Sequence, residues 1–126
     1  MEISFNPFPT IESQNLILRR MNHTDANDLF KMRNDERMNE FTDSVNDKNI
    51  SDTINYINKM NNGIDQSKWI IWAISLKESN KVIGTICIWN LNEEESSGEL
   101  GYRIMPSFQR RGYMKESLRE VLNMDF

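Results

Sequence analysis

The sequence contains few of the residues that build metal centres and disulfide frameworks. Among its 126 residues there is one cysteine, Cys87, and one histidine, His23. A disulfide framework needs paired cysteines and zinc sites are built mainly from cysteine and histidine, so both are excluded. A metal site would have to consist of carboxylates alone, and no spacing typical of such a site is present. We therefore expect no metal.

An excess of basic residues and long apolar runs are also missing. The chain has 15 Lys and Arg against 19 Asp and Glu, a net charge of −4. A nucleic-acid-binding domain normally has a basic surface, and a bilayer-spanning helix needs about 20 apolar residues. Met1–Thr10 lacks the basic start and apolar run of a signal peptide. We expect a cytoplasmic protein that binds neither nucleic acid nor membrane, with an acidity that suits a cationic partner such as an amine.

The composition that remains is that of one globular domain. Hydrophobic residues make up 38% and charged residues 27%, and no repeat or linker divides residues 1–126. The first half predicts one strand and two helices. Leu16 and Leu18 alternate with other residues in a strand over 15–20, and Thr24 is suited to cap a helix ending near Asn34. Helical spacing of apolar residues predicts a second helix over 50–61, ended by a left-handed Asn62-Gly63.

The second half predicts three strands and a helix. Residues 69–76 and 82–89 are rich in β-branched and aromatic residues and form a hairpin, residues 91–97 form a solvated turn, and residues 99–104 form a third strand. A helix then starts at about Gly112, with an apolar stripe of Tyr113, Ser117, Leu118, Val121 and Leu122. The order β-α-α-β-β-β-α predicts a mixed α/β sheet layered with helices.

The segment between the last strand and the last helix has the features of an anion site. A strand leads into a loop with Arg110, Arg111 and Gly112, and a helix begins at once. The first N–H groups of a helix have no partner within it, and the helix dipole favours an anion there. Glycine allows the backbone to approach a bulky ligand. These residues predict a pyrophosphate site, although glycine after basic residues is also common at an ordinary solvated helix start.

The same segment resembles the coenzyme A loop of the GNAT N-acetyltransferases. The motif of that loop is Gln/Arg-x-x-Gly-x-Gly/Ala, and this chain has Gln109, Arg110, Arg111, Gly112, Tyr113 and Met114. The surrounding Glu99-Leu100-Gly101-Tyr102, Pro106 and Glu116 resemble the RimJ/RimL-like (ribosomal-protein-alanine acetyltransferase) branch. Upstream, Leu16–Arg20 and Lys81–Gly84 resemble the first and third strands of that branch, so the resemblance covers nearly the whole chain from Thr10.

The resemblance implies the acyl-CoA N-acyltransferase (GNAT) fold and acetyl-CoA as co-substrate. In this family the loop amides, here those of residues 109–114, hold the pyrophosphate. The end of the preceding strand, here Ile104 and Met105, pairs with pantetheine through the backbone. The acetyl group passes directly to a primary amine, of a protein N-terminus or of a small molecule. Met114 departs from the Gly/Ala of the motif, but only its N–H is needed.

Glu99 is the candidate general base, acting through water, because a glutamate on this strand has that role in some family members. An α-amino group titrates near 8 and lysine near 10.4, so an N-terminal amine demands less of a base. The alternative is that Glu99 is an ordinary strand carboxylate. The sequence does not identify the acceptor.

The family fold continues with a strand, a helix and a hairpin that this sequence lacks, including the helix with the group that protonates the thiolate. We therefore expect a partial N-acetyltransferase domain. The alternative function is a catalytically inactive remnant that binds coenzyme A or mediates protein association. A strand over Glu99–Ile104 without its neighbour exposes an edge, which makes a homodimer by strand or segment exchange a further hypothesis.

Overall fold

A five-stranded antiparallel sheet forms the centre of the computed structural model, which describes residues 5, 7–35, 47–92 and 97–123. Neighbouring strands follow chain order across the sheet. They are β1 (Ile11–Glu12), β2 (Leu16–Arg19), β3 (Ile70–Leu76), β4 (Val82–Asn92) and β5 (Ser97–Ile104). The predicted order of strands and helices is confirmed, with the short β1 as an addition.

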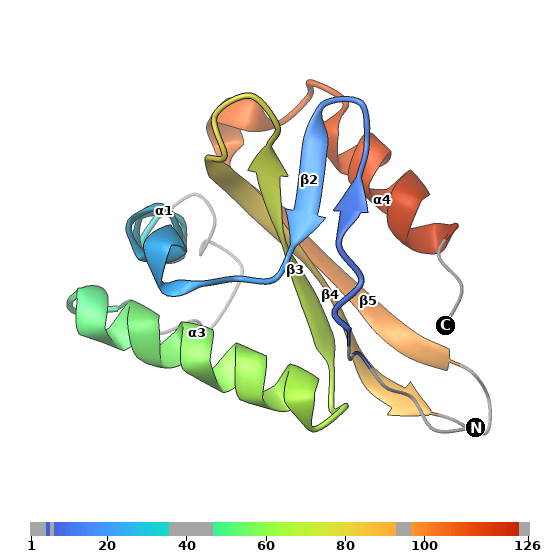
Figure 1. Cartoon of the computed structure of the whole chain (residues 1–126). Coiled ribbons are helices and arrows are strands. Elements are labelled where there is room, and N and C mark those ends of the chain that lie inside the picture. The colour runs from blue at the N-terminus through green and yellow to red at the C-terminus, as the bar shows by residue number, and fades with distance from the viewer. Residues whose placement is uncertain (1–4, 6, 36–46, 93–96, 124–126) are drawn as a thin grey trace.

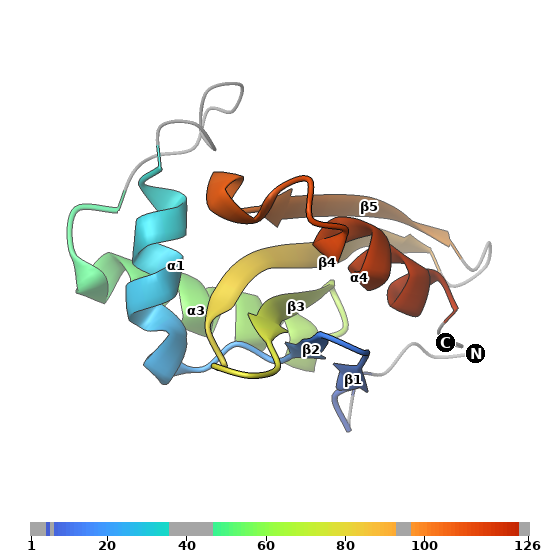
Figure 2. The same cartoon turned by 90° about the horizontal axis from the view of Figure 1, so that it is seen from above.

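Helices cover both faces of this sheet (Figures 1 and 2). A 3-10 turn, η1 (His23–Asp25), leads into α1 (Ala26–Arg33), which lies with α3 (Ile50–Asp65) on one face. After the 3-10 turn η2 (Pro106–Phe108), α4 (Tyr113–Leu122) lies on the other face. In the part of the chain that the structure describes, no helix has the length and apolar character needed to cross a bilayer.

The strand register separates the side chains of the two faces, because successive residues of a strand point in opposite directions. Ile70 lies opposite Ile88 and Trp72 opposite Ile86, so these four share a face. Tyr56 of α3 interacts with Cys87 and Arg103, whose side chains point to the opposite face. The face of Trp72 is therefore the one that α4 covers. Trp72 is fully buried and donates from Nε1 to the Pro9 carbonyl at 2.8 Å. Burial of each such large apolar side chain stabilises the fold by about 1.5–3 kcal/mol.

The β4–β5 hairpin is longer than predicted. The turn expected over 91–97 begins only after Asn92 and ends before Ser97, so both strands extend into it, and the residues between them lie outside the described part. Leu91 packs against the core and lies close to Gly98, where a Cβ would be 3.2 Å from Leu91 Cδ2. The acidic run that follows Leu91 suggested an earlier turn, and cross-strand packing outweighs that signal.

The first helix is capped by Asn22, not by Thr24 as predicted. The Asn22 side chain accepts from the Thr24 N–H at 2.9 Å, and the Asp25 carboxylate accepts from the Asn22 N–H at 3.0 Å. This reciprocal capping box lies two residues earlier because the helix opens with a 3-10 turn. Asp25 is buried and pairs with both terminal nitrogens of Arg19 at 2.8 Å, which joins β2 to the helix start.

Gly63 does not end the second helix, contrary to the prediction from Asn62-Gly63. The helix continues to Asp65, and Gly63 is not in the left-handed region. Instead, the Trp69 indole lies against it: a Cβ on Gly63 would be 2.0 Å from Trp69 Cε2. Trp69 Nε1 donates to the Met60 carbonyl at 3.0 Å, which fixes the ring there. The glycine is thus needed for close packing between α3 and the residue that precedes β3.

The predicted apolar stripe of the last helix is only partly correct. Ser117 and Val121 are buried, but Leu122 is 71% exposed. Helical geometry places Leu122 100° from Val121, beyond the edge of the face that meets the sheet.

An ion pair joins Arg33, the last residue of α1, to Asp47, three positions before the start of α3. Asp47, whose side chain is 7% exposed, accepts from Arg33 Nε at 2.7 Å and from Thr53 Oγ1 at 2.7 Å. Burial alone would raise the pKa of Asp47, but the hydrogen bonds from Arg33 and Thr53 outweigh it and hold the pKa below its ordinary value of 3.8. The Arg33 guanidinium also lies 3.8 Å from the centre of the Tyr56 ring. This cluster connects the end of α1 to the start of α3.

Gly63→Ala should destabilise the protein, although alanine is the better helix former. The new Cβ must displace the Trp69 indole, at an expected cost of about 1–3 kcal/mol. The control is Asn62→Ala at the adjacent exposed position, which should be neutral or gain up to about 0.7 kcal/mol from helix propensity. Urea unfolding of both variants measures this. A Gly63→Ala variant as stable as Asn62→Ala would contradict the packing explanation.

Asp47→Asn should lower the free energy of unfolding at pH 7 by about 2–3 kcal/mol, because Arg33 loses its buried partner. The folded-state pKa of Asp47 is lowered, so its stabilisation is complete above the ordinary value of 3.8 and is lost as the pH falls through the folded pKa. The difference between wild type and variant should therefore shrink below about pH 4. Thermal melts from pH 7 to pH 3 test this, and a constant difference would show that the carboxylate charge is irrelevant.

Candidate functional site

The segment between β5 and α4 lies at the end of the sheet where the β1–β2 and β3–β4 turns also lie (Figure 1). Its path is fixed by short main-chain hydrogen bonds. Met105 N–H donates to the Ile83 carbonyl at 2.7 Å, and Phe108 N–H donates to the Met105 carbonyl at 2.8 Å. Gln109 N–H then donates to the Pro106 carbonyl at 3.2 Å. These bonds turn the chain sharply at the end of β5.

The next residues turn their main-chain N–H groups away from any internal partner. Arg110 and Gly112 have φ angles of +62° and +82°, both in the left-handed region. Within the described ranges, no hydrogen bond is donated by the main-chain N–H groups of residues 110–115. The last three of these groups belong to the first turn of α4, which has no intrahelical acceptor for them. Successive free N–H groups next to a helix start form a concave anion-binding site.

Gly112 is needed for its backbone conformation and not because of crowding. A Cβ at this position would meet no atom within 4 Å, so the space beside it is open. A φ of +82° costs an ordinary residue about 1–2 kcal/mol. Arg110 adopts a similar conformation without being glycine, so strain is concentrated in this short loop.

Two positive side chains near the loop lie close to the ring of Phe108. Arg111 Cζ and Lys81 Nζ each lie 5.4 Å from the centre of that ring, and Tyr113 packs beside it at 6.4 Å. Lys81 belongs to the β3–β4 turn and was not predicted as a site residue, because its sequence neighbourhood showed only a strand beginning. Together with Arg110 it adds to a positive field around the free N–H groups.

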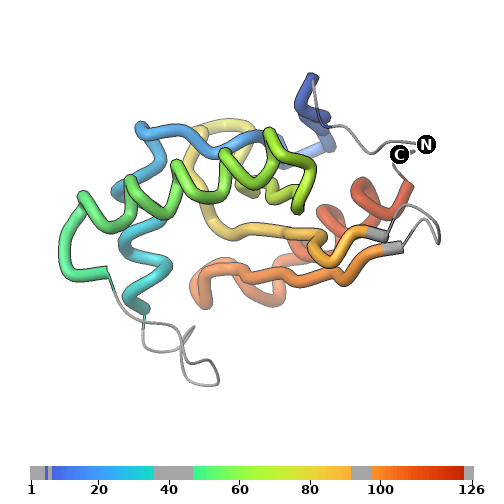
Figure 3. The backbone as a smooth tube through the Cα atoms, turned by 90° about the horizontal axis from the view of Figure 1, so that it is seen from below, coloured from blue at the N-terminus to red at the C-terminus, as the bar shows by residue number. Residues whose placement is uncertain are grey.

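The two strand-end residues predicted to pair with a ligand differ in availability. Met105 uses both main-chain groups within the chain, so its part in ligand pairing stays a prediction that requires one of these bonds to open. The Met105–Ile83 bond also sets the pattern of the hairpin: alternate residues Leu100, Tyr102 and Ile104 direct their main-chain groups away from β4. β5 is the last strand in the sheet order, so these groups lie on its outer edge (Figure 3).

Gln109 closes the outer end of that edge with its side chain. Its Nε2 donates to the Ile104 carbonyl at 3.1 Å. Of the two main-chain groups of Ile104, the N–H is therefore the one that has no partner among the described residues. Met114, the residue that departs from the family motif, is half-buried and packs against the core. Its larger side chain is therefore accommodated within the protein while its N–H stays unbonded.

Glu99, the predicted general base, lies far along β5 from the amide loop. It lies five positions before Ile104, a distance of about 17 Å along a strand. Its carboxylate accepts a hydrogen bond from Asn90 Nδ2, and it pairs in register with Trp89. The Trp89 ring covers Gly101, where a Cβ would be 2.5 Å from Cζ3. Glu99 therefore lies on the α3 face, apart from the amide loop but on the strand that leads into it.

Cys87 of β4 and Tyr56 of α3 lie near each other between α3 and that same face. Burial raises the pKa of the Cys87 thiol to about 11, so it is protonated at neutral pH and is a poor nucleophile. Burial also raises the pKa of Tyr56, against the opposing charge of Arg33. Within the residues that the structure describes, no three His, Cys, Asp or Glu side chains gather as metal ligands.

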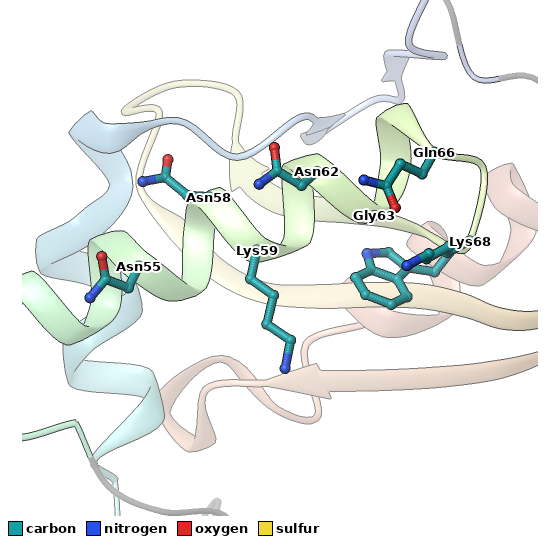
Figure 4. A pocket seen from close by; sticks show the side chains of 8 residues that line it. Asn55, Asn58, Lys59, Asn62, Gly63, Gln66 and Lys68 are labelled. Atoms are coloured by element: carbon teal, nitrogen blue, oxygen red, sulfur yellow. The ribbon is translucent and has the colours of Figure 1, made fainter.

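An open groove follows the exposed side of α3, distinct from the amide loop (Figure 4). Side-chain amides, lysines and the Trp69 indole line it, and none of the lining residues is acidic; they are Asn55, Asn58, Lys59, Asn62, Gly63, Gln66, Lys68 and Trp69. No residue predicted for the site belongs to it.

A family model described as an acetyltransferase (GNAT) domain matches residues 15–126. The uncharacterized N-acetyltransferase YoaA of Bacillus subtilis is 27% identical over 119 residues, which cover 94% of this chain and 67% of YoaA.

Solved structures of acetyltransferases have a similar fold. One is the Salmonella typhimurium acetyl transferase that modifies the N-terminal serine of ribosomal protein L7/L12, with a TM-score of 0.75, 18% identity and coverage of 90% of this chain and 65% of that one. Another is the microcin C7 self-immunity acetyltransferase MccE in complex with acetyl-CoA and AMP, with a TM-score of 0.76, 18% identity and coverage of 87% and 62%. The predicted fold class is confirmed, and the chain spans about two thirds of the length of these relatives.

Proposed function

The chain belongs to the GNAT acetyltransferase family, and we propose that it binds acetyl-CoA and transfers the acetyl group to a primary amine. The observation that carries this proposal is the row of unbonded main-chain N–H groups over residues 110–115. A diphosphate offers several anionic oxygens that accept such bonds, and the dipole of α4 adds to the attraction. MccE, which has a similar fold, was solved with acetyl-CoA, in keeping with this ligand.

The positive side chains support a highly charged ligand. Arg110 and Arg111 are exposed on the loop, and Lys81 of the β3–β4 turn lies 5.4 Å from the centre of the Phe108 ring, as does Arg111. The chain as a whole carries a charge of −4, so this local accumulation opposes the general field. We assign these side chains to the diphosphate and the adjacent nucleotide phosphate.

The outer edge of β5 provides a path for the pantetheine arm. The amide groups of the pantetheine arm can hydrogen-bond to a strand edge as another strand would. The Ile104 N–H and the main-chain groups of Tyr102 point outward along this edge. An arm that runs from the amide loop along β5 carries its thioester toward Glu99, which lies about 17 Å along the strand from Ile104.

At that end, Glu99 is the proposed general base. The amine nitrogen attacks the thioester carbonyl, the C–N bond forms as the C–S bond breaks, and the thiolate takes up one proton. The amine loses a proton in the same reaction, and Glu99 accepts it through a water molecule. The hydrogen bond from Asn90 holds this carboxylate in one orientation.

The acceptor is proposed to be the α-amino group of a protein or a small primary amine. An α-amino group with a pKa near 8 is partly neutral at physiological pH, which a carboxylate base requires. The same open β5 edge would also accept a second copy of the chain, so coenzyme binding and strand-mediated dimerisation compete in this proposal. Light scattering with and without acetyl-CoA measures that competition.

Acetyl-CoA binding tests the proposal through two substitutions at one position. Gly112→Val should weaken binding about 5- to 30-fold, because a β-branched residue disfavours the left-handed conformation by about 1–2 kcal/mol. Gly112→Asn also adds a Cβ but tolerates that conformation, so its binding should stay closer to wild type. Isothermal titration calorimetry gives the three dissociation constants. No heat with wild type, or equal affinities for wild type and Gly112→Val, would refute the assigned coenzyme site.

Glu99→Gln should lower kcat by about 100-fold or more while leaving the KM for acetyl-CoA unchanged, because the amide cannot accept the proton. Glu78→Gln, which removes an exposed carboxylate from the β3–β4 turn, is the control and should keep wild-type kcat. A thiol-release assay with an amine acceptor provides the rates. Full activity of Glu99→Gln would show that Glu99 is an ordinary strand carboxylate and not the general base.

A further inference from the structure

Glu116, in the first turn of α4, makes long-range hydrogen bonds that the proposed function does not use. Its Oε2 accepts from the Ser13 hydroxyl and from the Asn15 main-chain N–H at 2.9 Å, and its Oε1 accepts from Asn15 Nδ2 at 3.0 Å. Both oxygens are thus engaged, with partners more than 100 positions away in the sequence. The carboxylate connects the start of α4 to the β1–β2 turn.

The β1–β2 turn is itself firmly fixed. Ser13 N–H donates to the Leu16 carbonyl at 2.9 Å, and Lys77 N–H donates to the Asn15 carbonyl at 3.0 Å. Lys77 Nζ also donates to the Ser13 carbonyl at 3.2 Å and pairs with Glu12 at 2.6 Å. Glu116 therefore attaches to a part of the sheet that the β3–β4 turn already holds in place.

The first turn of α4 is otherwise oriented by apolar contacts, since Tyr113 and Met114 pack against the core. Tyr113 and Met114 are half-buried and Lys115 is exposed, while the buried helix positions, Ser117 and Val121, come later. Over residues 113–116, all of which the structure describes, Glu116 is the residue whose side chain hydrogen-bonds to the sheet. These bonds add a polar attachment to the apolar contacts that orient this turn and its unbonded N–H groups.

The charge of Glu116 needs these bonds as much as the helix does. Burial raises its pKa, but the hydrogen bonds from Ser13 and Asn15 outweigh burial and hold the pKa below the ordinary value of 4.5, so it is ionised at neutral pH. An ionised carboxylate one turn from an anion site would repel a diphosphate. Three donors that draw it toward the β1–β2 turn reduce that repulsion.

From this geometry we propose that Glu116 is a positioning residue for coenzyme binding: it anchors the first turn of α4 to the β1–β2 turn and so holds the amide loop in its anion-binding form. This inference rests on the proposed function, since it concerns the same loop. It places no catalytic duty on Glu116, which does not face the Glu99 end of β5.

Glu116→Ala should weaken acetyl-CoA binding about tenfold, because a smaller fraction of molecules then holds the loop in its binding form. The KM for acetyl-CoA should rise by a similar factor, whereas kcat and the KM for the amine stay unchanged. Asn15→Ala should have a smaller effect, because the Asn15 main-chain N–H remains. The matched control is Glu120→Ala, one turn further along α4, where the carboxylate makes no hydrogen bond within the described residues.

A second thioester separates positioning from general damage to the fold. S-acetylpantetheine has the pantetheine arm but lacks the diphosphate, so Glu116→Ala should leave its kcat/KM unchanged while that for acetyl-CoA falls about tenfold. Thermal melts establish a temperature at which every variant is folded. An equal loss with both thioesters would overturn the inference in favour of a purely structural role.

The two proposals fail in different ways. If wild type gives no heat with acetyl-CoA in calorimetry, the proposed function is wrong and Glu116 has no coenzyme site to position. If wild type binds and Glu116→Ala binds equally well, the coenzyme site stands and the positioning inference is overturned.

Discussion

The candidate site depends on one constraint: six consecutive main-chain N–H groups, from residue 110 to residue 115, have no acceptor in the part of the chain that the structure describes. A buried N–H without a partner costs about 1–3 kcal/mol, so such a row is tolerated only where water or a ligand reaches it. The left-handed φ angles of Arg110 and Gly112 keep the row pointing outward. A relaxed helical start would instead let the chain use part of these groups internally, and the anion site would be lost.

Two turns and the end of β5, all at one end of the sheet, maintain this strained segment. The β5 end supplies the Met105–Ile83 bond, and the β3–β4 turn supplies Lys81 against Phe108. The β1–β2 turn supplies the donors to Glu116. Each contact joins residues far apart in sequence, so the loop acquires its shape only after the sheet has formed. Folding and site formation are therefore coupled, as expected for a site that stores strain in its backbone.

The sequence predicted local features well and contacts between elements poorly. β-Branched runs and helical periodicity identified the main strands and helices, and Gly112 was recognised from its place before a helix. The role of Gly63 was predicted wrongly. The position requires glycine because the Trp69 indole packs against it, a contact that no local sequence pattern shows. Leu122 was misjudged because the width of a helix interface depends on the neighbouring sheet. Lys81 was missed for the same reason: its relation to the loop arises from strand pairing, which the sequence does not specify.

In the proposed reaction, the separation of about 17 Å between Glu99 and Ile104, the last residue of β5 before the amide loop, has a functional logic. A diphosphate site needs positive field and free N–H groups, whereas a carboxylate base needs to avoid both, since nearby cations lower its pKa and weaken it as a base. Placing the two at opposite ends of β5 satisfies both requirements. The strand then serves as a rigid spacer, and its open edge is the natural lane for a linear arm that connects them. In the proposed arrangement the loop would set the affinity for the co-substrate and Glu99 would carry the chemistry, so each could change without the other.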